Sequence, residues 1–187
     1  AEPRYLDAAE RTLRAGWSLL ERYPHAHTSL LMALDELTEP STIVVLRGTG
    51  GHFCAGADLK AVARGDALRL DPAGDGPMGP SRMLLGKPVV AAISGAALGG
   101  GIGLAAACDI AIASTKAAFA TSEVRFGIIP AAISPYVLRA IGARQASRYF
   151  QTAERIDAAR AREIGLVHEV AEADQLDNKV QEIVAAL

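Results

Sequence analysis

The chain alternates between short, continuous apolar runs and longer segments in which apolar residues recur at helical spacing. The apolar runs predict buried strands at 41–48, 87–94, 108–114 and 166–170. Helical patterning predicts helices at 4–21, 28–39 and 59–64, after the glycines at 99–101, and at 133–142, 143–153, 157–165 and 173–187. Gly142 and Gly165 are placed to end two of these helices. Strands that alternate with helices predict an α/β domain with mostly parallel pairing.

Two glycine-rich turns each follow a strand and precede a helix. The first, TGGHFCAGAD, spans 49–58, and the second is the triplet at 99–101. Glycine costs about 1 kcal/mol relative to alanine in a helix, so its use there needs a reason. Close packing of a helix on a sheet is one reason. Another is that unpaired N–H groups at a helix start attract negative charge. Two such junctions in adjacent parallel units can direct two N–H groups at one oxygen, so the pair favours an oxyanion hole.

Other functions of these segments fit less well. The stretch GIGLAA at 101–106 matches a dinucleotide fingerprint, but the preceding strand ends about seven residues too early. No acidic residue closes the next strand, and no P-loop lysine is present. The uncharged run 88–108 is long enough to span a bilayer, yet its five glycines and opening proline favour a buried strand followed by a buried helix.

The composition narrows the class of protein. The 187 residues are 50% hydrophobic and 21% charged, which is typical of a globular domain with a core. A net charge of −2 without a basic stripe argues against a nucleic-acid partner. Cys54 and Cys108 lie far apart, so we expect no disulfide, no metal site and a cytoplasmic location. The segment 64–82, rich in proline, glycine and aspartate, is predicted to be a functional or mobile loop.

Four segments resemble the enoyl-CoA hydratase/isomerase (crotonase) superfamily, in its order and near its spacing. They are FCAGADLK, KPVVAAISGAALGGGIGLAAACDIAIAS, FATSEVRFGIIP and RIDAARAREIGLVHEV. The resemblance implies an α/β spiral of ββα units, acyl-CoA substrates and assembly as a homo-trimer or hexamer. It divides the chain into atypical N-terminal helices at 1–40, a crotonase core at 41–170 and a C-terminal helix at 171–187. Compared with the family, the chain is truncated or atypical at both ends.

The resemblance also assigns catalytic positions. The N–H groups of Ala57 and Gly100 correspond to the oxyanion hole, and Glu123, which follows an apolar strand, corresponds to a catalytic glutamate. Family hydratases usually carry a second glutamate, at the position that Gly103 occupies here. A single carboxylate has to make both proton transfers in turn, and an apolar pocket would raise its pKa. Further expected substrate contacts are Gly101, Gly103, Asp58, Ser134, Arg125 and His52.

The segment 122–167 looks most like the bacterial methylglutaconyl-CoA hydratase branch of the family. We therefore expect reversible hydration of a branched or carboxylated enoyl-CoA, without a metal ion or redox cofactor and without a membrane partner. One alternative is a Δ3-Δ2 enoyl-CoA isomerase, which needs only one glutamate. The other is a catalytically weak scaffold or binding module of the same fold, which Gly103 and the atypical ends would fit. His168 and Cys54 are expected to be structural.

Overall fold

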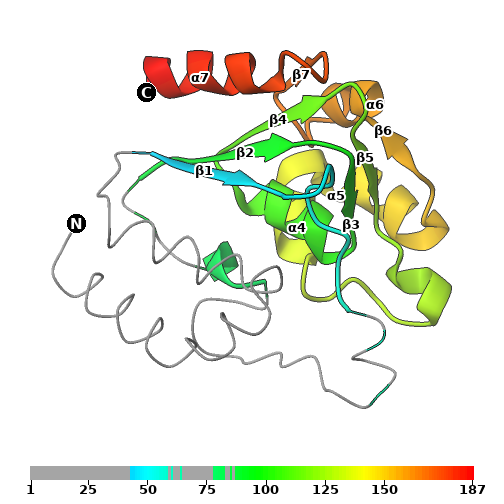
Figure 1. The fold of residues 1–187 in the computed structure, drawn as a ribbon. Helices are drawn as coiled ribbons and strands as arrows, with labels where there is room; N and C mark the ends of the chain where they lie inside the picture. The colour runs from blue at the N-terminus through cyan, green and yellow to red at the C-terminus, as the bar shows by residue number, and fades with distance from the viewer. Residues whose placement is uncertain (1–42, 59, 61–63, 65–77, 83–84, 86) are drawn as a thin grey trace, which may run out of the picture.

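The computed structural model describes residues 43–58, 60, 64, 78–82, 85 and 87–187. The helices predicted at 4–21 and 28–39, and most of those predicted at 59–64 and of the loop at 64–82, lie outside the described residues. Within the described part, the chain forms two sheets and a set of helices around them (Figure 1).

The larger sheet contains four parallel strands in the order β1-β2-β4-β7. Its two central strands are buried almost throughout, which explains why they are continuous apolar runs without alternation. Three strands confirm the predicted positions, whereas the last begins later than expected. The bounds are β1 Val44–Arg47, β2 Val89–Ile93, β4 Ile110–Ser114 and β7 Glu169–Ala171.

The late start of β7 has a local cause. The N–H groups of Leu166 and Val167 both donate to the carbonyl of Ala161, so these two residues close the end of helix α6 (Ala158–Glu163) instead of entering the sheet. Gly165, with φ of 82°, makes the turn between helix α6 and these two residues, as its predicted role as a helix stop requires.

The smaller sheet has the order β3-β5-β6, with β3 Ala96–Leu98, β5 Ala118–Ala120 and β6 Ile156–Asp157. The pair β3-β5 is parallel and the pair β5-β6 is antiparallel. Two successive turns of the chain each contribute one strand to each sheet and then a helix, namely the series β2, β3, α4 and the series β4, β5, α5. This succession is the predicted ββα spiral. Strands β3 and β6 are only three and two residues long, so no hydrophobic period marks them in the sequence.

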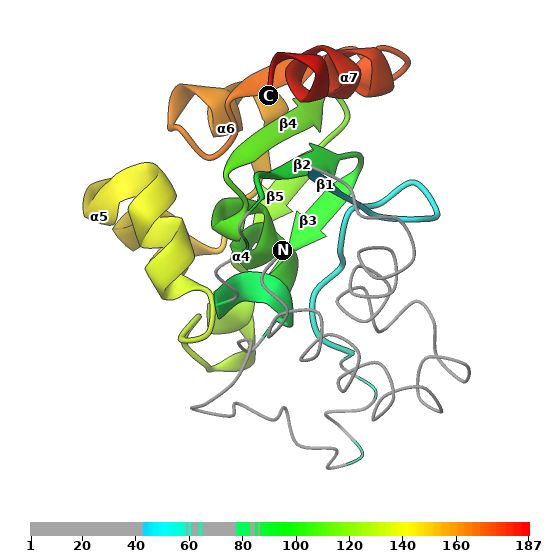
Figure 2. The same cartoon turned by 90° about the vertical axis from the view of Figure 1, so that its left-hand side faces the viewer.

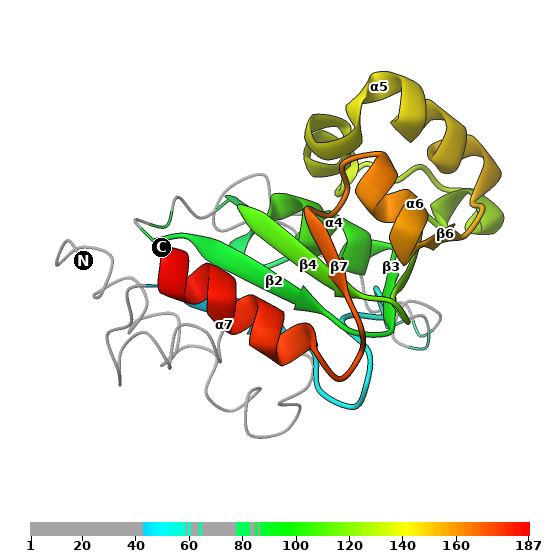
Figure 3. The ribbon, with the colours of Figure 1, turned by 90° about the horizontal axis from the view of Figure 1, so that it is seen from above.

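Helices cover both faces of the larger sheet. Figure 3 shows α7 (Leu176–Ala186) lying along one face, and on that face Leu176 and Val180 pack against Val90 and Ile112. Helix α4 (Gly100–Ala107) lies on the opposite face, and α5 (Ser134–Thr152) packs outside α4 (Figure 2). None of the described helices is long and apolar enough to cross a membrane.

Helix α5 spans both of the helices predicted at 133–142 and 143–153. At Gly142 the backbone has φ of 74° and ψ of 160°, so the helix is interrupted there, as the predicted stop requires. The helix resumes directly afterwards and ends at Thr152, and the N–H of the next residue, Ala153, donates to the carbonyl of Tyr149.

Candidate active site

The two glycine turns meet along one edge of strand β3. Cys54 forms a parallel β-bridge with Ala97, and the N–H of Leu98 donates to the carbonyl of Cys54 over 2.9 Å. The N–H groups of Phe53 and Cys54 both donate to the carbonyl of Ala96. The first turn is therefore attached to the strand that leads into the second.

The two turns also approach each other closely at Gly56. Its φ is 90°, and a Cβ built on it would lie 2.8 Å from the carbonyl oxygen of Leu98 and 3.7 Å from the nitrogen of Gly100. A side chain at residue 56 would therefore collide with the backbone that precedes helix α4. Glycine at this position lets the main chain next to Ala57 approach the N–H of Gly100, which begins the helix.

Glu123 lies at the same helix start. The N–H of Gly99 donates to the carbonyl of Ala120 over 2.9 Å, and this bond attaches strand β5 to the second glycine turn. Three residues later, Glu123 opens the short 3-10 helix η3 (Glu123–Phe126). Its Oε1 lies 3.5 Å from the position that a Cβ on Gly99 would take. The structure thus brings Glu123 and the glycine triplet together, although they are more than twenty residues apart in the chain.

The environment of Glu123 favours its protonated form. Its Oε2 is buried and has no hydrogen-bond partner among the described residues. Burial raises the pKa of the carboxyl group, and a hydrogen bond with its own backbone opposes this in part. A buried carboxyl oxygen without a partner is costly, because a lost hydrogen bond is not replaced by water. Such a group is a candidate for proton transfer to a bound molecule.

Gly103 faces a filled space. A Cβ built there would lie 2.6 Å from Cβ of Ile133 and 2.8 Å from Sδ of Met78, and it would contact Cγ2 of Ile133 more closely still. Met78 also lies 4.0 Å from a Cβ built on Gly100. Two apolar side chains therefore occupy the place where a second glutamate would have to enter. Sequence reasoning identified the missing glutamate but not these two residues, whose contact with α4 depends on tertiary packing.

Gly101, a predicted substrate contact, is also a packing residue. A Cβ at this position would lie 3.0 Å from Cβ of Cys54 and would collide with the carbonyl oxygen of that residue. Gly101 thus contacts the first glycine turn. This contact agrees with close packing as the reason for glycine at this position of the triplet. Contact of Gly101 or Gly103 with a substrate stays a prediction.

Two predicted residues of the first turn have local partners. Nδ1 of His52 accepts a hydrogen bond from the N–H of Ala96 over 3.1 Å, which helps to attach the turn to β3. Oδ1 of Asp58 accepts from the N–H of Lys60 over 2.9 Å, an arrangement typical of a residue that caps a helix start. These contacts give both side chains a role in shaping the turn.

The two predicted site residues after Glu123 also form hydrogen bonds within the protein. Nη2 of Arg125 donates to the carbonyl of Ala153 over 2.7 Å, at the end of α5. Oγ of Ser134 donates to the carbonyl of Ala131 over 3.2 Å, at the start of the same helix. Neither contact involves Glu123, so the structure does not bring these two side chains to the carboxyl group through a hydrogen bond.

The remaining titratable candidates are structural. His168 accepts from the N–H of Ala111 and its own N–H donates to the carbonyl of that residue, so it joins the loop before β7 to β4, as expected. Cys54 and Cys108 are both free thiols. Burial raises the pKa of Cys108 to about 12, and the neighbouring Asp109 adds to the effect, which makes this thiol unreactive. In the described part, no three His, Cys, Asp or Glu side chains form a group suited to a metal ion.

Comparison with known proteins decides the family. The model of the family described as enoyl-CoA hydratase/isomerase matches residues 24–187. The chain belongs to the enoyl-CoA hydratase/isomerase family. The match extends over more than half of the sequence, and it includes both glycine turns, Glu123 and all the described helices and strands.

Relatives of this enoyl-CoA hydratase/isomerase family member come from several organisms. The mevalonyl-coenzyme A hydratase SidH of Aspergillus fumigatus is 38% identical over 156 residues, which is 80% of this chain and 57% of that protein. The enoyl-CoA hydratase EchA19 of Mycobacterium tuberculosis is 35% identical over 154 residues, 76% of this chain and 56% of its own length. The chain spans about three fifths of the length of the curated relatives it matches.

Solved structures show the same fold. The crystal structure of an enoyl-CoA hydratase from Shewanella pealeana superposes with a TM-score of 0.72 at 38% identity, covering 83% of this chain and 60% of that one. A crotonase-family structure from Legionella pneumophila gives the same TM-score at 39% identity, with 84% and 63% covered. The architecture described above is therefore the crotonase fold.

Proposed function

We propose that the protein adds water reversibly to an α,β-unsaturated acyl-CoA. One observation carries the proposal: Glu123 presents a buried, unpartnered carboxyl oxygen beside the start of α4, where the first glycine turn also arrives. Membership of the enoyl-CoA hydratase/isomerase family supports the reaction class. The N–H groups of Ala57 and Gly100 are the proposed donors to the thioester oxygen.

In this proposal, one carboxyl group makes both proton transfers. The carboxylate of Glu123 accepts a proton from water as the water oxygen bonds to C3 of the substrate. The electron pair of the double bond moves toward the carbonyl, and the resulting enolate oxygen accepts hydrogen bonds from the two N–H groups. The protonated Glu123 then delivers its proton to C2, which restores the carboxylate and completes a syn addition. The raised pKa of Glu123 suits this exchange, because burial makes the protonated form, which delivers the proton to C2, easier to reach.

We assign the substrate to the branched or carboxylated enoyl-CoA thioesters, of the methylglutaconyl-CoA kind. The sequence of 122–167 supports this choice by its likeness to that branch of the family. A relative named for mevalonyl-CoA, whose acyl group carries a methyl branch, is in keeping with it. The proposal requires no metal ion or redox cofactor, and it places the reaction in the cytoplasm.

A second candidate is the Δ3-Δ2 enoyl-CoA isomerase. The observation in its favour is the filled space at Gly103, since Ile133 and Met78 leave no room there for a second carboxylate. Movement of a proton from C4 to C2 by Glu123 alone would be sufficient for isomerisation. The two activities use the same donors and the same carboxyl group, so only the product distinguishes them.

Incubation with a 2-enoyl-CoA and with a 3-enoyl-CoA in ¹⁸O-labelled water tests the proposal. Hydration predicts label in the product of the first substrate, and isomerisation predicts a shifted double bond in the second without label. Glu123→Gln is expected to lower either turnover by about 10²-fold or more. Glu182→Gln, at an exposed position on α7, is the matched control and should leave turnover unchanged. Turnover that is equally slow in the native protein and in Glu123→Gln would instead favour a scaffold.

Assembly as a homo-trimer or hexamer is part of the same proposal. Four apolar side chains next to Glu123 are exposed in the single chain, up to 78% for Ile129; they are Val124, Phe126, Ile128 and Ile129. Contiguous exposed apolar residues are typical of surfaces that become covered by a partner. Light scattering coupled to size-exclusion chromatography gives the mass in solution, and a monomer at micromolar concentration would contradict this assignment.

A further inference from the structure

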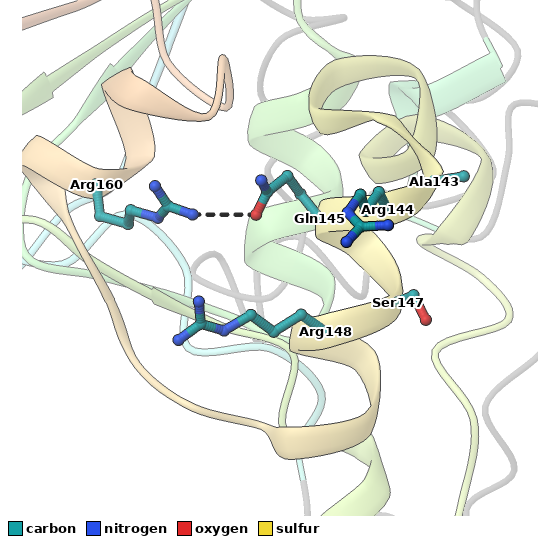
Figure 4. Close-up of a pocket in the computed structure, with 6 residues that line it drawn as sticks. All are labelled: Ala143, Arg144, Gln145, Ser147, Arg148 and Arg160. Carbon is teal, nitrogen blue, oxygen red and sulfur yellow. Dashed lines mark hydrogen bonds between the residues drawn. The ribbon is translucent and has the colours of Figure 1, made fainter.

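An open cavity of about 700 Å³ lies between α5 and α6, outside the Glu123 site. Figure 4 shows its lining, which comes from the second half of α5 and from one residue of α6: Ala143, Arg144, Gln145, Ser147, Arg148 and Arg160. Three of the six residues carry a guanidinium group and none carries a carboxylate. Two of these guanidinium groups pair with carboxylates just outside the lining, Arg148 with Glu154 and Arg160 with Glu163. The third, on Arg144, gives the lining a positive charge that is unpaired among the described residues, in a protein whose net charge is −2.

One arginine orients a neutral side chain in this cavity. Nη2 of Arg160 reaches across from α6 and donates to Oε1 of Gln145 over 3.1 Å (Figure 4). Nε of Arg160 donates to the hydroxyl of Tyr149, and its Nη1 pairs with Glu163, so the guanidinium is held from three sides. Because Oε1 of Gln145 is occupied, the amide is fixed, and its Nε2 has no hydrogen-bond partner among the described residues. Gln145 is left as a donor.

The other polar side chains of the cavity are donors as well. Arg148 uses Nε and Nη2 on Glu154, which leaves its Nη1 available. Arg144 is exposed and has no side-chain partner in the described part of the structure. Oγ of Ser147 accepts from Nε2 of Gln151, so its own hydrogen remains to be donated. The side-chain acceptors of the lining, on Gln145 and Ser147, each already accept one hydrogen bond, whereas free donors remain on four residues.

A lining of donors selects a ligand that only accepts hydrogen bonds. Fully ionised phosphate groups are such ligands, and the guanidinium fork matches their geometry. The volume lies in the range of about 300–1,000 Å³ typical of sites for small organic molecules, which exceeds the need of a single inorganic ion. We propose that this cavity, the arginine cavity of α5 and α6, binds a phosphate-bearing organic anion of nucleotide size.

Calorimetric titration of the full chain tests the site, with pyrophosphate as the probe of phosphate chemistry and ADP as the probe of ligand size. Both probes are expected to bind saturably at physiological salt, ADP more tightly. Arg144→Ala should weaken ADP binding by about tenfold or more, because a hydrogen bond to a charged group is lost. Gln145→Glu should weaken it at least as much: Oε1 remains for Arg160, but the donor is replaced by a negative charge.

Arg162→Ala is the matched control, since it removes the same charge from α6 at an exposed position outside the cavity. It should change ADP affinity less than threefold. The proposal is overturned if neither probe binds saturably, or if Arg162→Ala and Arg144→Ala weaken binding equally, because the effect would then be general charge screening. A pyrophosphate affinity equal to that of ADP would contradict the assigned ligand size. The readout needs no catalytic turnover, and ADP bound at the proposed acyl-CoA site is distinguished because its binding would survive Arg144→Ala; ADP binding unaffected by Arg144→Ala therefore also overturns the proposal.

Discussion

Glu123 lies against Gly99, the residue that precedes helix α4. The distance from Oε1 of Glu123 to a Cβ built on Gly99 would be 3.5 Å, which is ordinary van der Waals contact. The backbone of Gly99, with φ of 51° and ψ of −117°, is also one that other residues rarely adopt. The backbone conformation, and not a clash with Glu123, is therefore what requires glycine at residue 99.

Replacement of Gly99 by alanine should harm both stability and turnover. The strained backbone is expected to cost about 1–3 kcal/mol of unfolding free energy. Relaxation of the strained backbone at residue 99 is expected to move Glu123 and the N–H of Gly100 relative to each other, and a misplacement of about 1 Å lowers kcat by about 10²-fold. Gly142→Ala is the control, because Gly142 likewise has a positive φ, of 74°, but no atom of the described residues lies within 4 Å of its Cβ position. It should lose similar stability without the loss of kcat. Equal losses of kcat in both variants would contradict the link to Glu123.

Two glycines of helix α4 should respond to alanine with opposite signs. A Cβ on Gly100 meets only Met78, at 4.0 Å, so Gly100→Ala should gain about 0.5–1 kcal/mol from higher helix propensity. A Cβ on Gly103 meets Ile133 at 2.6 Å, so Gly103→Ala should lose about 1–3 kcal/mol by overpacking. Urea unfolding monitored by circular dichroism measures both. A neutral Gly103→Ala would show that Ile133 and Met78 move aside readily, and a second carboxylate would then be admissible.

The raised pKa of Glu123 links stability to pH. The folded protein holds the proton of this carboxyl group more tightly than the unfolded chain does, so protonation favours folding. The contribution is complete below the ordinary glutamate pKa of about 4.3 and is lost as the pH rises through the raised value of the folded state. Glu123→Gln, which mimics the protonated group, should therefore melt at a higher temperature than the native protein at neutral pH. The difference should vanish in acid, and a difference that grows in acid would have the wrong sign.

Arg125 is expected to stabilise the fold and not to bind substrate. Its guanidinium donates to the carbonyl of Ala153, and loss of this bond in Arg125→Ala should cost about 1–2 kcal/mol, less than a fully buried charged bond. We expect KM for an acyl-CoA to change less than threefold. Arg139→Ala, at an exposed position of α5, serves as the control and should stay within about 0.5 kcal/mol of the native protein. A raised KM with unchanged stability would restore the predicted contact of Arg125 with a substrate carboxylate.

Local patterns in the sequence were sufficient for the central strands and for the helix stops. Strands β2 and β4 are buried on both faces, so burial alone makes their sequences recognisable as continuous apolar runs. Gly142 and Gly165 have positive φ, which glycine adopts without strain, and this requirement is also readable locally. Strands β3 and β6 are too short for any period, and they exist because main-chain pairing with neighbours completes them.

The site divides in the same way. The glycine turns are visible because an unusual backbone demands an unusual residue, and Glu123 was identified through its place in a family motif. Met78 and Ile133 carry no such mark. Their contact with Gly103 joins segments about thirty residues apart and depends on how α5 packs on α4, which no local pattern encodes. For the same reason, the partners of His52 and Arg125 emerged only from the three-dimensional arrangement.

The small sheet has a consequence for how the site can diversify. Cys54, β3 and β5 lie on successive rows of main-chain pairing, and each row leads into one contributor to the site: the first glycine turn, the glycine triplet and Glu123. Neighbouring rows are held about 4.8 Å apart by peptide geometry, whatever side chains they bear. The spacing of the reactive parts is thus built from the one component of a protein that substitution does not alter. Surrounding side chains such as Met78 can therefore be replaced to fit a different acyl group, while the distances between the reactive parts stay the same.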